Sequence, residues 1–340
     1  MVIEKKSKLD QALDNTEQID LTLSYSKLSG FDRNGSVSLV RQSNVENDGV
    51  KFGSLVDDLL FNDKDYFNEN YYIFDGEKPT ATLGALCDII LKNYLIIPTI
   101  DDIVNIIVLN KFWANIKNQD TLIEKFNNEE FWSYLKCKYD TVNKTVVTSK
   151  EYEDSKEIIH ILKTHKYSKH ILINDYENIS QLKFSIKYRK FKINGILDLI
   201  SIDHKNKIVY FTDLKTGKNP AIEFEESFIK WRYYFQGAIY CLAFFEICKT
   251  LKLKDYKLAP FQFLYISKSD KIPLLFKMTE KWIKAAMNGF SINRYKFKGV
   301  NELIDEIYWC WKNKEYSIPK YVVENNGIIN LRDNFIEINE

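Results

Sequence analysis

The chain has 340 residues, of which 45% are hydrophobic, enough for one large or two modest globular units with a substantial core. Its 48 Lys and Arg against 47 Asp and Glu leave a formal net charge of +1, so any affinity for nucleic acid must come from a local patch. No apolar run reaches the roughly 18 residues of a membrane span. The first 20 residues lack the apolar core of a signal peptide, and we therefore expect a cytoplasmic protein without a membrane partner.

The amino-terminal half is predicted to be mainly helical. Residues 1–20 are polar, and we expect them to be a loosely held amino-terminal segment that leads into the fold. Residues 21–170 are predicted to form the helical part. Apolar spacing predicts helices over 50–61, 84–97, 101–116 and, after a capping Thr148, over 149–165.

From residue 171 onward the pattern changes to alternating strands and helices, and we take 171–340 as a second part. Residues 181–215 alternate with period two and predict a hairpin or meander of strands. A helix over 224–247, a strand over 258–267 and a helix over 279–297 are expected next, followed by a mixed tail.

The cysteines do not form a recognisable framework. No two are spaced as C-x-x-C, and their odd number argues against paired disulfides and against a closed zinc site. Cys241 and Cys248 are seven residues apart on a predicted helix and should share its buried face. The five are Cys87, Cys137, Cys241, Cys248 and Cys310.

Two strand carboxylates carry the main chemical signal. Asp198 interrupts an apolar strand, and a buried carboxylate must be paired, bound to metal or exposed. Asp213 and Lys215 follow in the next strand and, two residues apart, face the same side. The two Asp with the Leu214 carbonyl could hold Mg²⁺, or Mn²⁺, while Lys215 serves a water or the charge on phosphorus. An ordinary ion pair at a turn is the alternative.

The following helix adds two polar residues. Gln236 and Tyr240 are four apart, so they lie on one helix face and could reach a strand or a phosphate together.

The order G-x-x-D, D-x-K and Q-x-x-x-Y resembles the PD-(D/E)xK nuclease superfamily, in particular its RecB-like and exonuclease VIII-like branch, which includes phage recombination exonucleases. Tyr233 or Tyr234 fits the aromatic residue that such helices often carry. The matching residues are Gly195, Asp198, Asp213, Lys215, Gln236 and Tyr240.

This resemblance implies an α/β, restriction-endonuclease-like fold, with a mixed central sheet flanked by helices and an added helical amino-terminal half. It implies a Mg²⁺-dependent DNA exonuclease acting on linear duplex ends, plausible in phage-type recombination, with a single-strand annealing protein as a candidate partner and an oligomer as an open alternative. The catalytic residues would be Asp198, Asp213, Lys215, Gln236 and Tyr240.

Upstream, the resemblance is weaker. Residues 23–31 are similar to the Ser-rich segment of RecB-like nucleases, and 52–61 resembles a helix that often carries a metal-binding His. This chain has Asp57 there, either a harder oxygen ligand or a solvated helix residue. Relatives often have a Glu early in the strand before G-x-x-D, where this chain offers Gln181, with Glu177 nearby.

A basic surface is expected around these motifs. Its lysines and arginines could neutralise DNA phosphates, although lysines also protect edge strands. The predicted DNA-binding residues are Lys183, Lys187, Arg189, Lys190, Lys218, Lys230 and Arg232.

The sequence also bears on other cofactors and other functions. The cysteine spacing after Tyr240 does not fit an iron–sulfur cluster. The sequence contains no Walker A motif, so we expect no nucleotide cofactor. The four His lack ligand spacing near the carboxylates, and His204 is expected in an exposed turn. An endonuclease of the same fold and a non-catalytic DNA-end or protein-binding module remain alternatives.

Overall fold

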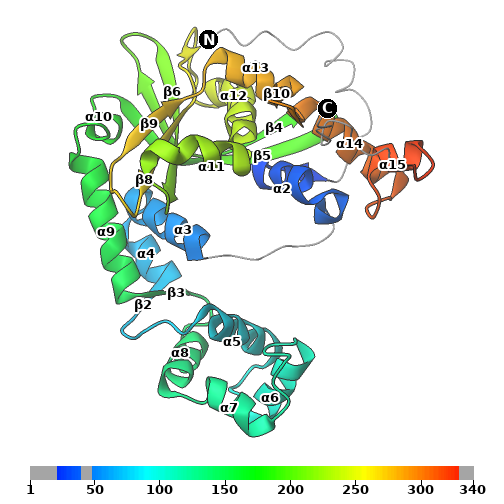
Figure 1. The fold of residues 1–340 in the computed structure, drawn as a ribbon. Helices are drawn as coiled ribbons and strands as arrows, with labels where there is room; N and C mark the ends of the chain where they lie inside the picture. The colour runs from blue at the N-terminus through cyan, green and yellow to red at the C-terminus, as the bar shows by residue number, and fades with distance from the viewer. Residues whose placement is uncertain (1–20, 40–47, 329–340) are drawn as a thin grey trace, which may run out of the picture. The chain divides into compact units, whose positions relative to one another are not determined.

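The computed structural model describes residues 21–39 and 48–328 of the chain (Figure 1). The protein divides into two compact units, one made of residues 1–53 with 161–340 and the other of residues 54–160. Helices α3 (Asp48–Phe61) and α9 (Ser149–Thr164) run across the two boundaries. The sequence-based boundary at residue 170 stays a prediction.

A mixed sheet forms the centre of the first unit. Its main path runs β1-β5-β6-β8-β9, with β4 paired to β5 and β7 paired to β6. β4, β5 and β6 are antiparallel neighbours, whereas β6 and β8 run parallel. The predicted α/β class, with a mixed central sheet flanked by helices, is confirmed. The strands are β1 (Thr22–Leu23), β4 (Glu177–Tyr188), β5 (Phe191–Asp203), β6 (Ile208–Gly217), β7 (Lys257–Leu258), β8 (Gln262–Ser267) and β9 (Leu274–Lys277).

Helices of the same unit pack on the sheet and on one another. The central one, α12 (Tyr233–Thr250), is apolar on nearly every side because the sheet, α2 and α13 surround it. Its Phe244 ring meets Phe211 of β6 edge-on at 6.1 Å. The other helices are α2 (Tyr25–Asn34), α10 (Lys169–Leu172), α11 (Phe224–Lys230), α13 (Glu280–Asn288), α14 (Val300–Asn313) and α15 (Lys320–Glu324), with the 3-10 turns η1 (Ser36–Leu39) and η2 (Ala221–Glu223).

Four helices predicted from the sequence end earlier in the structure. Those expected over 84–97 and 101–116 end at Asn93 and Leu109. The helix expected over 224–247 is broken at Trp231 and Arg232, because Arg232 adopts a left-handed backbone conformation with φ 62°. The helix expected over 279–297 ends at Gly289, whose φ of 88° stops α13. A small antiparallel hairpin of β10 (Phe290–Ile292) and β11 (Tyr295–Phe297) follows instead.

The second unit is mainly helical, as predicted. A core that includes Leu86, Ile107 and Phe131 joins helices α5 to α8, and two short parallel strands pair in the same unit. The predicted cap of α9 is confirmed, since Thr148 and Glu151 hydrogen-bond reciprocally at its start. The remaining elements are α4 (Lys64–Asn70), β2 (Tyr71–Phe74), α5 (Ala81–Asn93), α6 (Ile100–Leu109), α7 (Gln119–Phe126), α8 (Glu129–Asp140) and β3 (Thr145–Thr148).

Two further predictions concern the cysteines and membrane-spanning helices. All five cysteines are buried and unpaired, and Cys241 and Cys248 both lie on α12 as expected. None of the helices in residues 21–39 and 48–328 combines the length and the apolar character that crossing a membrane requires.

Candidate active site

The central feature of the site is a fork between β5 and β6. On this edge β5 pairs with β1 at Lys192 and Ile193, and with β6 only from Leu199 onward. The last pair before the strands separate is Leu199 with Thr212, so Asp198 and Asp213 stand opposite each other where the ladder opens. The two predicted carboxylates are therefore brought together by strand pairing.

Backbone groups released at the fork serve Asp198. The N–H of Leu214 donates to Asp198 Oδ2 at 2.8 Å rather than to a strand partner. In extended backbone the N–H and C=O of one residue project from the same strand edge, so the Leu214 carbonyl also lies on the Asp198 side of β6.

A chain of polar side chains holds Asp213 from the opposite direction. Lys215 forms an ion pair with Asp213 Oδ2, and Gln236 Nε2 donates to Asp213 Oδ1 at 2.5 Å. The same amide donates to the Tyr240 hydroxyl at 3.0 Å. Asp213, Gln236 and Tyr240 are all buried. The structure thus joins the three sequence motifs in one network.

Gly195 makes room for this network. A Cβ at Gly195 would lie 2.4 Å from the Phe184 ring and 3.0 Å from the Tyr240 ring. Phe184 is the cross-strand partner of Gly195 and packs edge-on against Tyr240, with the ring centroids 5.3 Å apart. The missing side chain in β5 therefore leaves room for the Phe184 and Tyr240 rings, which gives the G-x-x-D glycine a steric reason.

The fork holds more acidic than basic groups: Asp198 and Asp213 lie beside a single ammonium group, that of Lys215. Burial, and then the neighbouring Asp213 carboxylate, raise the pKa of Asp198 to about 8. Burial likewise raises the pKa of Asp213, although Lys215 opposes that shift. For Lys215 burial acts to lower the pKa, but Asp213 and Asp198 outweigh it and hold the pKa well above its usual value. Two carboxylates thus share one ammonium group.

The donor set fits a hard divalent cation. Oxygen ligands and an excess negative charge suit Mg²⁺ or Mn²⁺, which keep several waters and need only one or two carboxylates. Asp198 is only partly buried, so the fork is reachable from solvent. Within the described ranges, no group of three or more His, Cys, Asp or Glu is placed to hold a metal. The two Asp and the Leu214 carbonyl are thus the candidate protein ligands at the fork.

Gln181 and Glu177, the candidates for a further metal ligand in β4, occupy different positions along the strand. Gln181 falls opposite Asp198, between the pairs Ser180–Leu199 and Leu182–Leu197, and its φ is 52°. Glu177 lies farther along the strand, where its carboxylate contacts His204 at 2.7 Å. His204 is exposed after β5, as predicted.

Asp57 lies in α3, within the unit formed by residues 54–160. Burial and then the hydrogen-bonded Asp58 carboxylate raise the pKa of Tyr71, and the Asp57 carboxylate adds a smaller effect in the same direction. Earlier in the same helix, within the first unit, a Cβ at Gly53 would lie 3.2 Å from Thr216 Oγ1, just after the D-x-K strand positions. Asp57 as a metal ligand stays a prediction.

The predicted basic residues fall into two groups. Three of them have structural partners: Arg189 pairs with Asp305 at 2.6 Å, Lys190 donates to the Tyr308 hydroxyl at 3.0 Å, and Arg232 pairs with Asp32 at 2.6 Å. The other four are exposed, namely Lys183, Lys187, Lys218 and Lys230.

Lys183 and Lys187 project from the outer face of the β4–β5 hairpin. Burial alternates along this part of β4, with Phe184 and Ile186 in the core and the lysines outside. Lys187 stands directly opposite Lys192, and like charges in that position repel.

Two aromatic residues lie near Lys215, of which the sequence indicated Tyr233, as an alternative to Tyr234, and gave no role to Tyr25. The Lys215 ammonium lies 5.2 Å from the centre of the Tyr233 ring, and Tyr25 of α2 packs 6.1 Å from Tyr233. Tyr233 was one of two residues considered for this place; Tyr234 is fully buried instead. The position of Tyr25 in the Ser-rich segment was the only available signal.

Comparisons with known proteins add little to this geometry. No family model matches the chain, and no curated protein matches it. A solved structure from Eubacterium rectale, described as a candidate exonuclease, is similar with a TM-score of 0.34 and 15% identity, over 66% of this chain and 81% of that chain. A functional assignment therefore depends on the site itself.

Proposed function

We propose that this protein is a metal-dependent DNA exonuclease that hydrolyses phosphodiester bonds at the ends of linear duplex DNA. The observation that carries the proposal is the fork: Asp198 and Asp213 oppose each other beside Lys215, and Gln236 and Tyr240 hold Asp213 in place. A purely structural ion pair would need only one of the two carboxylates.

Asp198, Asp213 and the Leu214 carbonyl would hold Mg²⁺, or Mn²⁺. When bound, the cation would polarise the scissile phosphate and offset the charge that develops on it. Gln236 fixes the orientation of Asp213, because its amide donates to Asp213 Oδ1, and Tyr240 in turn accepts from the same amide. These two residues position a ligand group rather than transfer a proton.

Lys215 acts as a charged donor in this proposal. Since its pKa lies well above the usual value, the ammonium stays protonated at neutral pH. It can orient the attacking water or donate to a phosphate oxygen, and such preorganised donors contribute most when charge develops in the transition state. The exposed lysines of the β4–β5 hairpin would bind the DNA backbone.

The test is cleavage of end-labelled linear duplex and of a closed circular duplex, each with Mg²⁺, with Mn²⁺ and with EDTA. We expect metal-dependent release of nucleotides from the linear duplex only. Asp213→Asn should abolish the activity, whereas Asp175→Asn, a change at an exposed carboxylate in the loop before β4, should not.

Each other result has a definite meaning. Cutting of the closed circle would establish an endonuclease of the same fold in place of an exonuclease. Binding of the linear duplex without cleavage under any metal condition would favour the non-catalytic module. Full activity in EDTA, or in folded Asp213→Asn, would overturn the site.

A further inference from the structure

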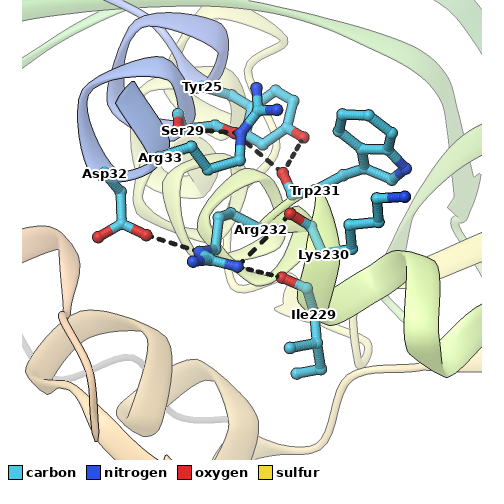
Figure 2. A network of polar contacts seen from close by, with 8 residues as sticks. All are labelled: Tyr25, Ser29, Asp32, Arg33, Ile229, Lys230, Trp231 and Arg232. Atoms are coloured by element: carbon cyan, nitrogen blue, oxygen red, sulfur yellow. Dashed lines mark hydrogen bonds and ion pairs between the residues drawn. The ribbon is translucent and has the colours of Figure 1, made fainter. Parts of the chain in front are cut away.

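An exposed tryptophan stands at the break between α11 and α12. Trp231 is 37% exposed, although tryptophan is highly buried on average. Figure 2 shows that its indole ring points away from a polar network that holds its backbone. The Trp231 carbonyl accepts two hydrogen bonds from α2, at 2.7 Å from the Tyr25 hydroxyl and at 2.9 Å from the Ser29 hydroxyl.

The next residue holds the break in a strained conformation. Arg232 has φ 62°, a region that non-glycine residues occupy only when their surroundings enforce it. Its guanidinium pairs with Asp32 at 2.6 Å and donates to the Ile229 carbonyl at 2.8 Å (Figure 2). Bonds from two segments thus fix the backbone on both sides of an exposed aromatic ring.

Two cations adjoin the ring. The Arg33 guanidinium lies 5.0 Å from the ring centre and is held by Ser29, to whose hydroxyl and carbonyl its Nε donates at 3.2 Å. The Lys230 ammonium lies 5.2 Å from the same ring, on an exposed and flexible side chain. Because Asp32 is already paired with Arg232, the surroundings of Trp231 keep a positive charge.

Contacts connect Trp231 to the carboxylate fork. The Tyr25 ring, whose hydroxyl binds the Trp231 carbonyl, packs against Tyr233. Tyr233 in turn faces the Lys215 ammonium, which pairs with Asp213. The exposed ring therefore lies a few side chains from the groups proposed to cut DNA.

We propose that Trp231 is a stacking platform for an unpaired base of the DNA strand next to the scissile phosphate. The base would stack on the indole and displace the Lys230 side chain, whose ammonium would then contact the adjoining phosphate, as would Arg33. An aromatic ring with flanking cations is the combination that binds single-stranded nucleic acid. Every base has a π face that can stack on the ring, and every phosphodiester group carries a negative charge that a cation can bind. This inference rests on the proposed function and adds that the enzyme holds a frayed or single-stranded end.

The test is equilibrium binding in EDTA, where no cleavage is needed. The probes are a blunt duplex and duplexes with a short 5′ or 3′ overhang, each also made with one abasic site in the overhang. The variants are Trp231→Ala, Trp231→Phe and the control Phe245→Ala, which removes an aromatic ring that is 51% exposed on α12. Thermal melts check that each variant is folded, and the backbone carbonyl of Trp231 is kept in all of them.

We expect Trp231→Ala to bind one overhang probe about 5- to 100-fold more weakly, the size of one lost base stack. The affinity of Trp231→Phe for the same probe should stay within about threefold of that of the wild type, because a phenyl ring still stacks. The affinity of the control Phe245→Ala should equal that of the wild type. An abasic site at the stacked position should weaken the wild type but not Trp231→Ala, since the same contact cannot be lost twice.

Two outcomes overturn the inference. The first is that folded Trp231→Ala binds every probe, both overhang duplexes included, within twofold of the wild type. The second is that the effects of the abasic site and of Trp231→Ala simply add. If either occurs while the wild type still cuts DNA, the platform is wrong and the proposed function stands. If the folded wild type binds no probe and cuts no DNA, both are wrong.

Discussion

Gly195 of β5 lies against the ring of Tyr240 of α12, so closely that a Cβ on the glycine would be 3.0 Å from the Tyr240 ring and 2.4 Å from that of Phe184. This contact connects the strand that carries Asp198 with the helix that holds Asp213. The position of the helix residues therefore depends on a side chain that is missing from the strand.

Gly195→Ala should lower both stability and cleavage. The added methyl group must push the Phe184 or Tyr240 ring, and overpacking of this kind typically costs about 1–3 kcal/mol of unfolding free energy. Because Tyr240 would move, the bond from Gln236 to Asp213 should weaken and the rate should fall. Chemical denaturation and a cleavage assay measure the two effects.

The matched control for this change is Gly84→Ala in helix α5. A Cβ at Gly84 would meet no atom within 4 Å, and alanine is the better helix former. We expect unchanged or slightly higher stability and unchanged cleavage. Equal effects of the two substitutions would remove the steric role assigned to Gly195.

Lys215→Ala should slow cleavage on the order of 10²–10³-fold while DNA and metal still bind, because one preorganised donor to the developing charge is lost. Lys215→Arg should not restore the rate, since a guanidinium is larger, planar and differently directed. Single-turnover cleavage with saturating enzyme, beside a separate binding assay, gives both quantities.

Lys205→Ala, at an exposed turn after β5, serves as the control for Lys215. It should cut at the rate of the wild type. Cleavage by Lys215→Ala within a few-fold of the wild type would make the Asp213–Lys215 pair a structural ion pair.

Asp198→Asn should change how stability depends on pH in the metal-free protein. The pKa of Asp198 is about 8 in the folded state and ordinarily 3.8, so its stabilising contribution is complete below about pH 4 and is lost as pH rises through about 8. The variant has no such loss, so its stability relative to the wild type should rise between about pH 4 and pH 8.

Unfolding in EDTA across that pH range measures the difference, and unfolding with added Mg²⁺ completes the experiment. Mg²⁺ should raise the melting temperature of the wild type, more so at higher pH because binding displaces a proton, but should hardly affect the variant. A stability difference that is constant with pH would contradict the raised pKa.

Removal of Lys183 and Lys187 together should weaken DNA binding and reduce its dependence on salt. Each phosphate contact contributes about 0.9 to the slope of log K against log salt, so losing two should lower the slope by about 2. Fluorescence anisotropy at several salt concentrations measures the slope.

Arg189→Ala is the contrasting variant on the same hairpin. Its ion pair with Asp305 holds the β4–β5 turn to α14, so we expect lower thermal stability and an unchanged salt slope. The opposite pattern, a slope that changes only in Arg189→Ala, would place the DNA path at the turn.

Asp57→Asn should lower the cleavage rate and raise the Mg²⁺ concentration required, if Asp57 is a ligand of the proposed metal. The neighbouring Asp58 is the control, because it accepts hydrogen bonds from Tyr71 at 2.6 Å and from Asn62 at 2.9 Å. Asp58→Asn should lower the melting temperature without changing the Mg²⁺ titration. An unchanged titration in Asp57→Asn would exclude Asp57 from the metal shell.

The sequence by itself determined the local elements and the order of the motifs. Alternation with period two located β4, β5 and β6, and the apolar runs located α3 and α9, because burial on one face is written directly into residue spacing. The same local information indicated Asp198, Asp213 and Lys215 as unusual, since charged residues interrupt apolar strands there. Spacing also showed that Gln236 and Tyr240 share a helix face.

Only the tertiary structure decided which of these residues meet. The opening of the β5–β6 ladder beyond Leu199 and Thr212 depends on pairing between distant segments, and it places the Asp198 and Asp213 carboxylates opposite each other. The break at Arg232 depends on its bond to Asp32, two hundred residues away in the chain. Basic residues that look alike in sequence have different environments for the same reason. Long-range contacts, which no local pattern encodes, give Arg189, Lys190 and Arg232 structural partners and leave Lys183, Lys218 and Lys230 on the surface.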